Sequence, residues 1–229
     1  MKIKMDSLLD GARNAEGIVL IIDVFRAFTT ASVAFARGAE KIVLVAEVEE
    51  ALALFKMGVG DLCIGEVGGV KPEGFHLGNS PFEMSTADVS GKTLIQSTRA
   101  GTVGVSLATR ADQIYVTSLV ISKPTVGAVI RQDPDLVTIV AMGAEGVVRT
   151  DEDEQCGLYI RNLLEGRQPD RDAVRSLVMT GNQTQKYEDR KFPQFHPKDP
   201  VLATNIDSYS FAIKVDRENG LLIARPEGT

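Results

Sequence analysis

The chain has 229 residues, of which 44% are hydrophobic, and its formal net charge is −6. This length can bury a substantial core, and we expect one domain over residues 1–229, with a loop-rich C-terminal segment from about residue 166. The acidic balance argues against a nucleic-acid partner, because phosphate backbones are bound by clustered Lys and Arg. No apolar run approaches the about 20 residues that span a bilayer, so we expect no membrane partner and a cytoplasmic protein that binds a small molecule.

Apolar runs typical of buried strands alternate with helical patterns through the first two thirds of the chain. Strands are expected at residues 18–22, 41–45, 62–64, 93–96, 113–116 and 136–141, and helices at 27–37, 48–57, 102–110, 125–131 and 151–164. This alternation predicts an α/β fold whose mainly parallel sheet carries helices on both faces. The ending FAIKV, DRENG and LLIAR predicts a C-terminal β-hairpin that turns near Asn219 and Gly220.

Two segments interrupt this alternation. The first, residues 65–81, reads GEVGGVKPEGFHLGNSP, and a connection of this length is often a binding loop. The second, residues 181–200, is polar and contains aromatic residues and prolines. We interpret it as a covering loop in preference to a lid over a site.

The first candidate site residues lie in DVFRAFTT, residues 23–30, where a β-branched strand gives way to a helix. Ligands of open α/β sheets usually bind at this carboxyl edge of the strands. Asp23 could hold a metal ion or move a proton there, and Arg26 could bind an anion. The alternative is that Asp23 only caps the following helix.

Glu66 follows the strand at residues 62–64 and lies inside the glycine-rich loop. The backbone can approach a ligand closely at such a place, and a carboxylate can reach a divalent cation. Lys71 and the GNSP sequence at residues 78–81 add a positive charge and hydrogen-bond donors. These neighbours favour a binding role over a merely solvated loop.

The sequence STRAGT, residues 97–102, leads from a strand directly into a helix. Unpaired N–H groups at a helix N-terminus, small residues and hydroxyl groups are typical of a phosphate site, and Arg99 could add a bidentate contact. No Walker loop is present. The alternative is an ordinary N-capped helix with a turn glycine.

A fourth stretch, MGAEGVVRTDEDE, follows the strand at residues 136–141. Thr150 and Asp153 have the spacing of a capping box, and acids are favoured in the first turn of any helix. A metal-binding role for Glu152 or Asp153 is an equal alternative, because three other loops are predicted to reach the same edge of the sheet.

The cysteines and histidines offer no independent site. Two cysteines cannot form a disulfide framework, and we expect Cys63 in the core. Four residues separate Cys156 from Arg161, where the loop of cysteine-based phosphatases requires five. His76 and His196 lack the spacing of zinc ligands.

The motifs DVFRAFTTA, GEVGG with KPEGFHLGNSP, STRAGT, and GAEG to TDEDEQCG together resemble, in this order, the 2-phosphosulfolactate phosphatase family over about residues 18–164. The resemblance implies an α/β phosphatase that uses Mg²⁺ to hydrolyse 2-phosphosulfolactate to 3-sulfolactate and phosphate, a step of coenzyme M biosynthesis. The positions that match the family's motifs are Asp23, Arg26, Thr29, Thr30, Glu66, Lys71, Gly78, Asn79, Ser80, Thr98, Gly101, Thr102 and Asp153. His76 and Arg99–Ala100 depart from the family's pattern, which leaves another small phosphorylated acid open as substrate.

With this resemblance, we expect Asp23 and Arg26 to be catalytic, and Asp23, Glu66 and Asp153 to hold magnesium directly or through water. The expected substrate-binding residues are Thr29, Thr30, Lys71, Gly78, Asn79, Ser80, Ser97, Thr98, Arg99, Gly101 and Thr102. The roles of nucleophile, base and metal ligand all stay open for Asp23, with the last two favoured. The alternative function is a non-catalytic phospholigand-binding or sensor protein, and we expect a homo-oligomer.

Overall fold

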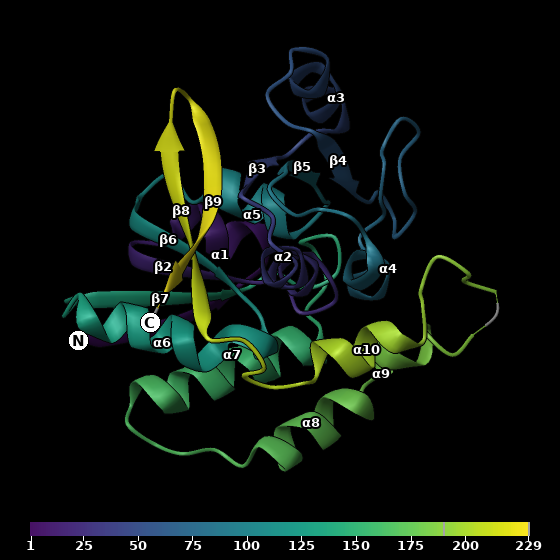
Figure 1. Cartoon of the computed structure of the whole chain (residues 1–229). Coiled ribbons are helices and arrows are strands. Elements are labelled where there is room, and N and C mark those ends of the chain that lie inside the picture. The colour runs from purple at the N-terminus through teal and green to yellow at the C-terminus, as the bar shows by residue number, and fades with distance from the viewer. Residues whose placement is uncertain (190, 229) are drawn as a thin grey trace.

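The computed structural model describes residues 1–189 and 191–228. Within them the chain builds one nine-stranded sheet with the strand order β1-β7-β2-β6-β8-β9-β3-β5-β4 (Figure 1). Its strands are β1 (Lys2–Ser7), β2 (Gly17–Ile22), β3 (Lys41–Val45), β4 (Leu62–Gly65), β5 (Thr93–Ser97), β6 (Ala111–Thr117), β7 (Leu136–Ala141), β8 (Phe211–Glu218) and β9 (Leu221–Gly228). All strands predicted from the sequence are therefore present.

The sheet consists of two parallel halves that the C-terminal hairpin joins. Strands β1, β7, β2 and β6 pair in parallel, as do β3, β5 and β4. Strand β8 pairs antiparallel with β6, and β9 pairs antiparallel with β3. The hairpin turns at Asn219 and Gly220, whose φ angles of 51° and 83° suit a two-residue turn between twisted strands. The predicted hairpin is confirmed, and it lies in the middle of the sheet (Figure 1).

Helices cover both faces of the sheet, as the alternating pattern predicts. They are α1 (Leu8–Asn14), α2 (Ala27–Ala36), α3 (Val48–Lys56), α4 (Pro81–Thr86), α5 (Gly101–Leu107), α6 (Ser122–Arg131), α7 (Asp151–Leu164), α8 (Arg171–Met179), α9 (Asn182–Gln185) and α10 (Lys198–Ala203). Helices α1, α2, α4 and α5 share one buried core with the sheet, which includes Phe28 and Val105. On the opposite face, α6, α7 and α8 cover one half of the sheet and α3 covers the other.

Several short elements were not predicted. Strand β1 is an edge strand whose residues are exposed or half-buried in alternation, so its sequence KIKMDS lacks the apolar run of a buried strand. The segment from about residue 166 contains α8, α9 and α10 and is less loop-rich than expected. The side chain of Asp170 accepts hydrogen bonds from the N–H groups of Asp172 and Ala173, which is a helix-start signal that sequence reasoning missed.

The fold brings the candidate motifs to one edge of the sheet. Strands β2, β4, β5 and β7 all run parallel within their halves, and each motif follows the carboxyl end of one of them. Helix α10 packs beside α4 (Figure 1), and Lys186 and Phe195, from the segment between α8 and α10, lie at the same edge. None of the helices in the described part of the chain is long and apolar enough to cross a membrane.

Candidate functional site

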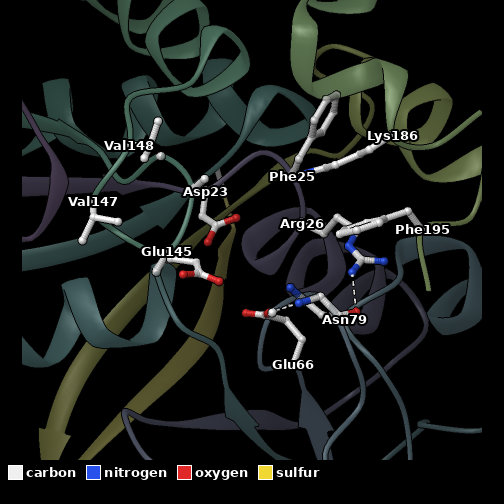
Figure 2. Close-up of a pocket in the computed structure, with 15 residues that line it drawn as sticks. Asp23, Phe25, Arg26, Glu66, Asn79, Glu145, Val147, Val148, Lys186 and Phe195 are labelled. Carbon is white, nitrogen blue, oxygen red and sulfur yellow. Dashed lines mark hydrogen bonds between the residues drawn. The ribbon is translucent and has the colours of Figure 1, made fainter. Parts of the chain in front are cut away.

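A pocket lies where the loops after β2, β4, β5 and β7 meet the C-terminal segment. Figure 2 shows the side chains that surround it. The lining residues are Asp23, Phe25, Arg26, Glu66, Gly68, Gly69, Asn79, Ala100, Gly143, Ala144, Glu145, Val147, Val148, Lys186 and Phe195. All four predicted motifs thus contribute to one cavity, which is the arrangement expected for a ligand site in an open α/β sheet.

Asp23 is held by the main chain of two different loops. Its side chain is only 5% exposed. Oδ1 accepts a hydrogen bond from the N–H of Ala27 at 2.9 Å, and Oδ2 accepts one from the N–H of Gly101 at 3.0 Å. Asp23 therefore binds the first N–H group of α2, although the N-cap residue of this helix is Arg26, and the same carboxylate also faces the pocket. This contact and a role in chemistry do not exclude each other here.

Glu66 and Asp153 repeat this pattern. Glu66 accepts hydrogen bonds from the N–H groups of Arg99 at 2.9 Å and Gly69 at 2.7 Å. Asp153 accepts them from Val24 at 2.7 Å and Gly143 at 2.8 Å. Each of the three carboxylates therefore accepts hydrogen bonds from two places in the main chain. These bonds hold the loops in position relative to one another.

The helix N-terminus in STRAGT is already occupied by these carboxylates. The N–H groups of Arg99 and Gly101, which were expected to bind phosphate, donate to Glu66 and Asp23. Thr98 and Thr102 bond to each other's backbone N–H groups through their hydroxyls. The guanidinium of Arg99 lies 3.6 Å from Glu47 at the surface and is not part of the pocket lining. The expectation that this turn binds phosphate stays a prediction, with fewer free donors than the sequence suggested.

Burial changes the protonation of the carboxylates at this edge. It raises the pKa of Asp23 to about 6, although the hydrogen bonds from Ala27 and Gly101 oppose the shift. Burial also raises the pKa of Glu152 to about 7 and that of Asp153 well above its ordinary value, and the negative charges of Asp23 and the neighbouring acid add to the effect on Asp153. The site therefore holds carboxylates that can gain or lose a proton near neutral pH.

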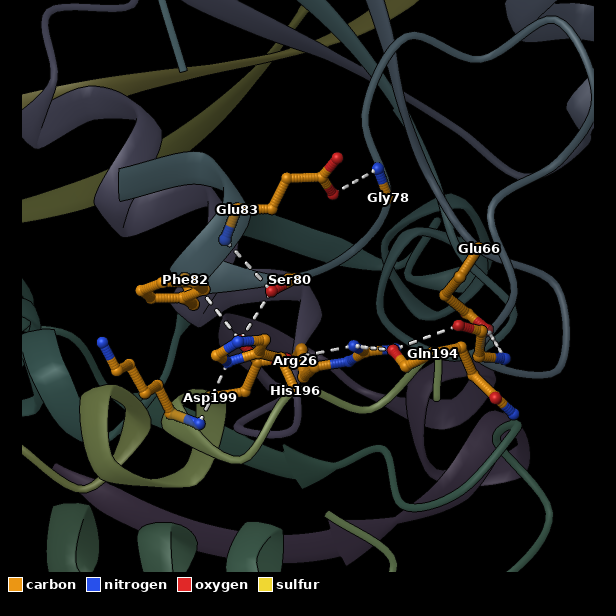
Figure 3. A network of polar contacts seen from close by, with 11 residues as sticks. Arg26, Glu66, Gly78, Ser80, Phe82, Glu83, Gln194, His196 and Asp199 are labelled. Atoms are coloured by element: carbon orange, nitrogen blue, oxygen red, sulfur yellow. Dashed lines mark hydrogen bonds and ion pairs between the residues drawn. The ribbon is translucent and has the colours of Figure 1, made fainter. Parts of the chain in front are cut away.

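Arg26 connects the pocket to the C-terminal segment (Figure 3). Its guanidinium is 3% exposed and donates to the backbone carbonyls of Gln194 at 2.9 Å and Gly69 at 3.2 Å, and to the carboxylate of Asp199 at 3.1 Å. Asp199 in turn accepts hydrogen bonds from the hydroxyl of Ser80 and the N–H of Phe82. The predicted catalytic arginine thus lines the pocket with most of its hydrogen-bonding capacity already used.

Asn79 provides a free acceptor in the pocket. Its side chain is 5% exposed, and Oδ1 has no hydrogen-bond partner. Figure 2 shows the amide between Arg26 and Glu66. A buried polar atom without a partner is costly, so this amide is poised for a ligand.

The other predicted substrate-binding residues lie around this pocket in different settings. Thr29 and Thr30 are buried in α2, where the hydroxyl of Thr29 bonds to the carbonyl of Val24. Lys71, Gly78 and Ser80 line a neighbouring cavity that shares Arg26, Gly69 and Asn79 with the pocket. Ser97 ends β5 and is buried. None of these six residues lines the main pocket.

Sequence reasoning missed several lining side chains, among them those of Phe25, Glu145, Lys186 and Phe195. Glu145 lies in the GAEG stretch of the fourth motif, seven residues before Glu152, the first acid weighed there as a metal ligand. Phe25 is half-buried, inside the first motif, but its apolar side chain carried no chemical signal. Lys186 and Phe195 belong to the segment at 181–200 that was interpreted as a covering loop. Only their aromatic and basic character could have indicated a site.

The three expected metal ligands do not form a metal cluster. In the described residues, no three or more His, Cys, Asp or Glu side chains are arranged to hold one ion, and Asp153 does not line the pocket. The pocket does offer oxygen donors from Asp23, Glu66, Glu145 and the unpartnered Asn79. This donor set fits magnesium bound by one or two carboxylates and otherwise by water, which is the coordination that this ion commonly keeps.

Two further expectations can be compared with the structure. The capping box at the start of α7 is wrong, because Thr150 makes no side-chain cap bond and Asp153 is turned toward Val24 and Gly143. Cys63 and Cys156 are both buried, and burial raises the pKa of the Cys156 thiol strongly. Such a thiol is unreactive, which agrees with the absence of a cysteine-phosphatase spacing.

The fold and the pocket define an α/β protein with a carboxylate-rich site at the carboxyl edge of its sheet. The family model of the 2-phosphosulpholactate phosphatases matches residues 5–193. A relative from Bacillus subtilis, named a probable 2-phosphosulfolactate phosphatase, is 33% identical over 204 residues, which cover 88% of each chain. Relatives of the same name from Carboxydothermus hydrogenoformans and Deinococcus radiodurans are 36% and 32% identical over 165 residues, or 72% of this chain and 68% of theirs. The chain belongs to the 2-phosphosulpholactate phosphatase family, a family of phosphoric monoester hydrolases.

Proposed function

We propose that the protein hydrolyses 2-phosphosulfolactate to 3-sulfolactate and phosphate with the help of magnesium. The family and the names of the relatives support the substrate. The observation that carries the chemistry is the pair of carboxylates, Asp23 and Glu66, which two sets of backbone N–H groups hold rigidly at the pocket. Fixed charges of this kind need no rearrangement when the reaction occurs.

Asp23 and Glu66 would hold magnesium, largely through water, and the bound ion would offset charge on the phosphoryl oxygens. In the hydrolysis, the oxygen of a water molecule bonds to phosphorus, the ester P–O bond breaks, and the sulfolactate oxygen leaves and takes up a proton. Asp23, which the N–H groups of Ala27 and Gly101 hold at the pocket, would accept the proton that the attacking water loses. The buried Asn79 amide, which lies between Arg26 and Glu66, orients the substrate together with Arg26 (Figure 2).

The test is phosphate release from racemic 2-phosphosulfolactate and a panel of small phosphorylated acids, with magnesium or with chelator. The native protein is compared with Asp23→Asn and with Asp88→Asn, which changes an exposed acid outside the pocket. We expect magnesium-dependent turnover that Asp23→Asn reduces at least about 100-fold and Asp88→Asn leaves unchanged, because a positioned general base contributes about 10²–10⁴-fold.

Two outcomes would contradict the proposal. Turnover in the presence of chelator would show that the reaction does not need magnesium, since the carboxylates alone would then suffice. Binding of 2-phosphosulfolactate without any phosphate release would favour the alternative of a phospholigand-binding or sensor protein. Calorimetry on the same samples separates binding from turnover.

A further inference from the structure

Two cationic side chains of the pocket lie beside one aromatic ring. The Cζ atom of Arg26 is 4.8 Å from the centroid of the Phe195 ring, and the Nζ atom of Lys186 is 4.7 Å from it. Each cation is attracted to the ring, but their like charges repel each other. In Figure 2 these side chains lie across the pocket from Asp23 and Glu145. One wall of the pocket is therefore positively charged, and an anion bound there would relieve the repulsion.

Lys186 is the more available of the two cations. Arg26 already donates to Gln194, Asp199 and Gly69. The ammonium group of Lys186 has a single hydrogen bond, to the neutral side-chain oxygen of Gln183 at 2.9 Å. Among the charged groups that act on this ammonium group, Glu152 has the largest effect, but no ion pair with it is found among the described residues. An ammonium has three donors, which leaves two for a ligand.

The surroundings of Lys186 strengthen a contact with an anion. The side chain is half-buried, and Phe25 and Phe195 line the pocket on the same side. Tyr187 packs edge-on against both of these rings. A wall of aromatic rings keeps water away, and a single charge–charge contact is stronger where water is scarce.

The side of the pocket that carries Lys186 differs in chemistry from the side that carries the carboxylates. Under the proposed function, Asp23 and Glu66 serve the phosphoryl group. The wall formed by Phe25, Phe195 and Lys186 combines apolar surface with the positive charge of Lys186, which suits a weakly hydrated monoanion.

We propose that Lys186 binds the sulfonate group of the substrate and is a specificity-determining residue of this site. The inference rests on the proposed function and adds to it the residue that distinguishes a sulfonated substrate from its unsulfonated analogue. The lysine comes from the C-terminal segment, outside the four loops that follow strands of the sheet. That segment is consequently part of the binding site.

The experiment compares two substrates that differ only in the sulfonate. Phosphate release from 2-phosphosulfolactate and from 2-phospholactate, in which a methyl group replaces the sulfomethyl group, is measured for the native protein, Lys186→Met and Lys186→Arg. Lys191→Met is the matched control, because Lys191 is exposed in the same segment and lines neither the pocket nor the neighbouring cavity.

We expect Lys186→Met to raise KM for 2-phosphosulfolactate by about 10- to 100-fold, the loss typical of a hydrogen bond to a charged group, with little change in kcat. The kinetics with 2-phospholactate should change less than about threefold, because the removed contact is absent from that substrate. Lys186→Arg should recover most of the affinity, and Lys191→Met should resemble the native protein. An equal loss on both substrates, or no loss on either, would overturn the inference.

Failure of the proposed function gives a different result from failure of the inference on Lys186. If the native protein hydrolyses neither substrate, the proposed reaction is wrong, and calorimetric titration with 3-sulfolactate and with lactate then decides the role of Lys186. Weaker binding of 3-sulfolactate to Lys186→Met than to the native protein, with lactate unaffected, supports the inference. Equal binding by the two proteins, or no binding of 3-sulfolactate to the native protein, contradicts it.

Discussion

Single side chains in this site both hold the backbone in place and face the pocket. Asp23 binds the N–H of Ala27 at the start of α2, binds the N–H of Gly101 and faces the pocket. The close approach of α5 to Asp23 depends on the lack of a side chain at Gly101, where a Cβ atom would lie 2.8 Å from Oδ2 of Asp23 and 3.0 Å from the ring of Phe28. Glycine is required at this position for contact distance rather than for an unusual backbone angle.

The substitution Gly101→Ala tests this contact. We expect it to push α5 away from Asp23, to lower kcat/KM by at least about tenfold and to destabilise the protein by about 1–3 kcal/mol through overpacking. Gly127→Ala is the matched control, because its Cβ atom would meet nothing closer than 3.7 Å and the helix α6 favours alanine. Unchanged activity in Gly101→Ala would show that the contact with Asp23 is dispensable. Steady-state kinetics and urea unfolding measure both effects.

The pKa of Asp23 predicts how the stability of the magnesium-free protein depends on pH. Burial raises this pKa from 3.8 to about 6, so the folded protein keeps the proton to a higher pH than the unfolded chain does. The contribution of Asp23 to stability is therefore greatest below about pH 4 and falls as the pH rises to about 6. Measured in chelator, the free energy of unfolding of the native protein should fall relative to Asp23→Asn by about 2–3 kcal/mol over this range. Parallel curves for the two proteins would contradict the raised pKa.

At the scale of elements, the C-terminal segment is attached to the site by one buried ion pair. Asp199 at the start of α10 is fully buried and binds Arg26 at the start of α2, together with the hydroxyl of Ser80 that caps α4. Phe82 and His196 stack beside this network, with ring centroids 4.0 Å apart. Three helix starts therefore converge on a single carboxylate (Figure 3).

Removal of this charge should detach the segment. We expect Asp199→Asn to destabilise the protein by about 3 kcal/mol, because it leaves the buried Arg26 without its counterion. The loss should be accompanied by faster proteolysis between residues 186 and 196. Asp88→Asn breaks the exposed ion pair with Lys92 and should cost less than about 1 kcal/mol. Equal, small losses in both variants would show that the buried pair is not what holds the segment.

At the scale of the whole molecule, the hairpin of β8 and β9 determines whether the two parallel halves act as one unit. Ile213 on β8 is fully buried and pairs with Val116 on β6, while Ala224 on β9 pairs with Ile42 on β3. The pocket takes Asp23 from one half of the sheet, and Glu66 and Asn79 from loops that follow the other half. The hairpin therefore fixes the distance between the two groups of site residues.

The substitution Ile213→Ala tests this coupling. We expect a loss of about 2–4 kcal/mol from the cavity it creates, and one unfolding transition in which amides of β2 and β5 lose protection from hydrogen exchange together. Leu177→Ala, at an exposed position of α8, should change stability by less than about 0.5 kcal/mol. Separate transitions for β2 and β5 would show that the halves fold independently of the hairpin.

The sequence by itself determined the buried strands, the longer helices that follow them and the motifs. Long apolar runs such as residues 136–141 predict buried strands wherever they lie, and the structure confirms β7 and α7 with the expected bounds. The turn at Asn219 and Gly220 was equally readable, because this residue pair favours the positive φ angles of the turn. Strands and turns of this kind depend on residues that are close together in the sequence, so they can be predicted without a structure.

Only the tertiary structure decided what the side chains contact. The insertion of the hairpin between β6 and β3 depends on pairing across about 100 and 180 residues of chain, which no local pattern encodes. Likewise, Glu66 and Asp23 occupy the N–H groups that the sequence alone assigned to phosphate. Lys186 joined the pocket because α9 and α10 bring a polar segment back to the sheet edge, and contacts between such distant segments arise only from packing.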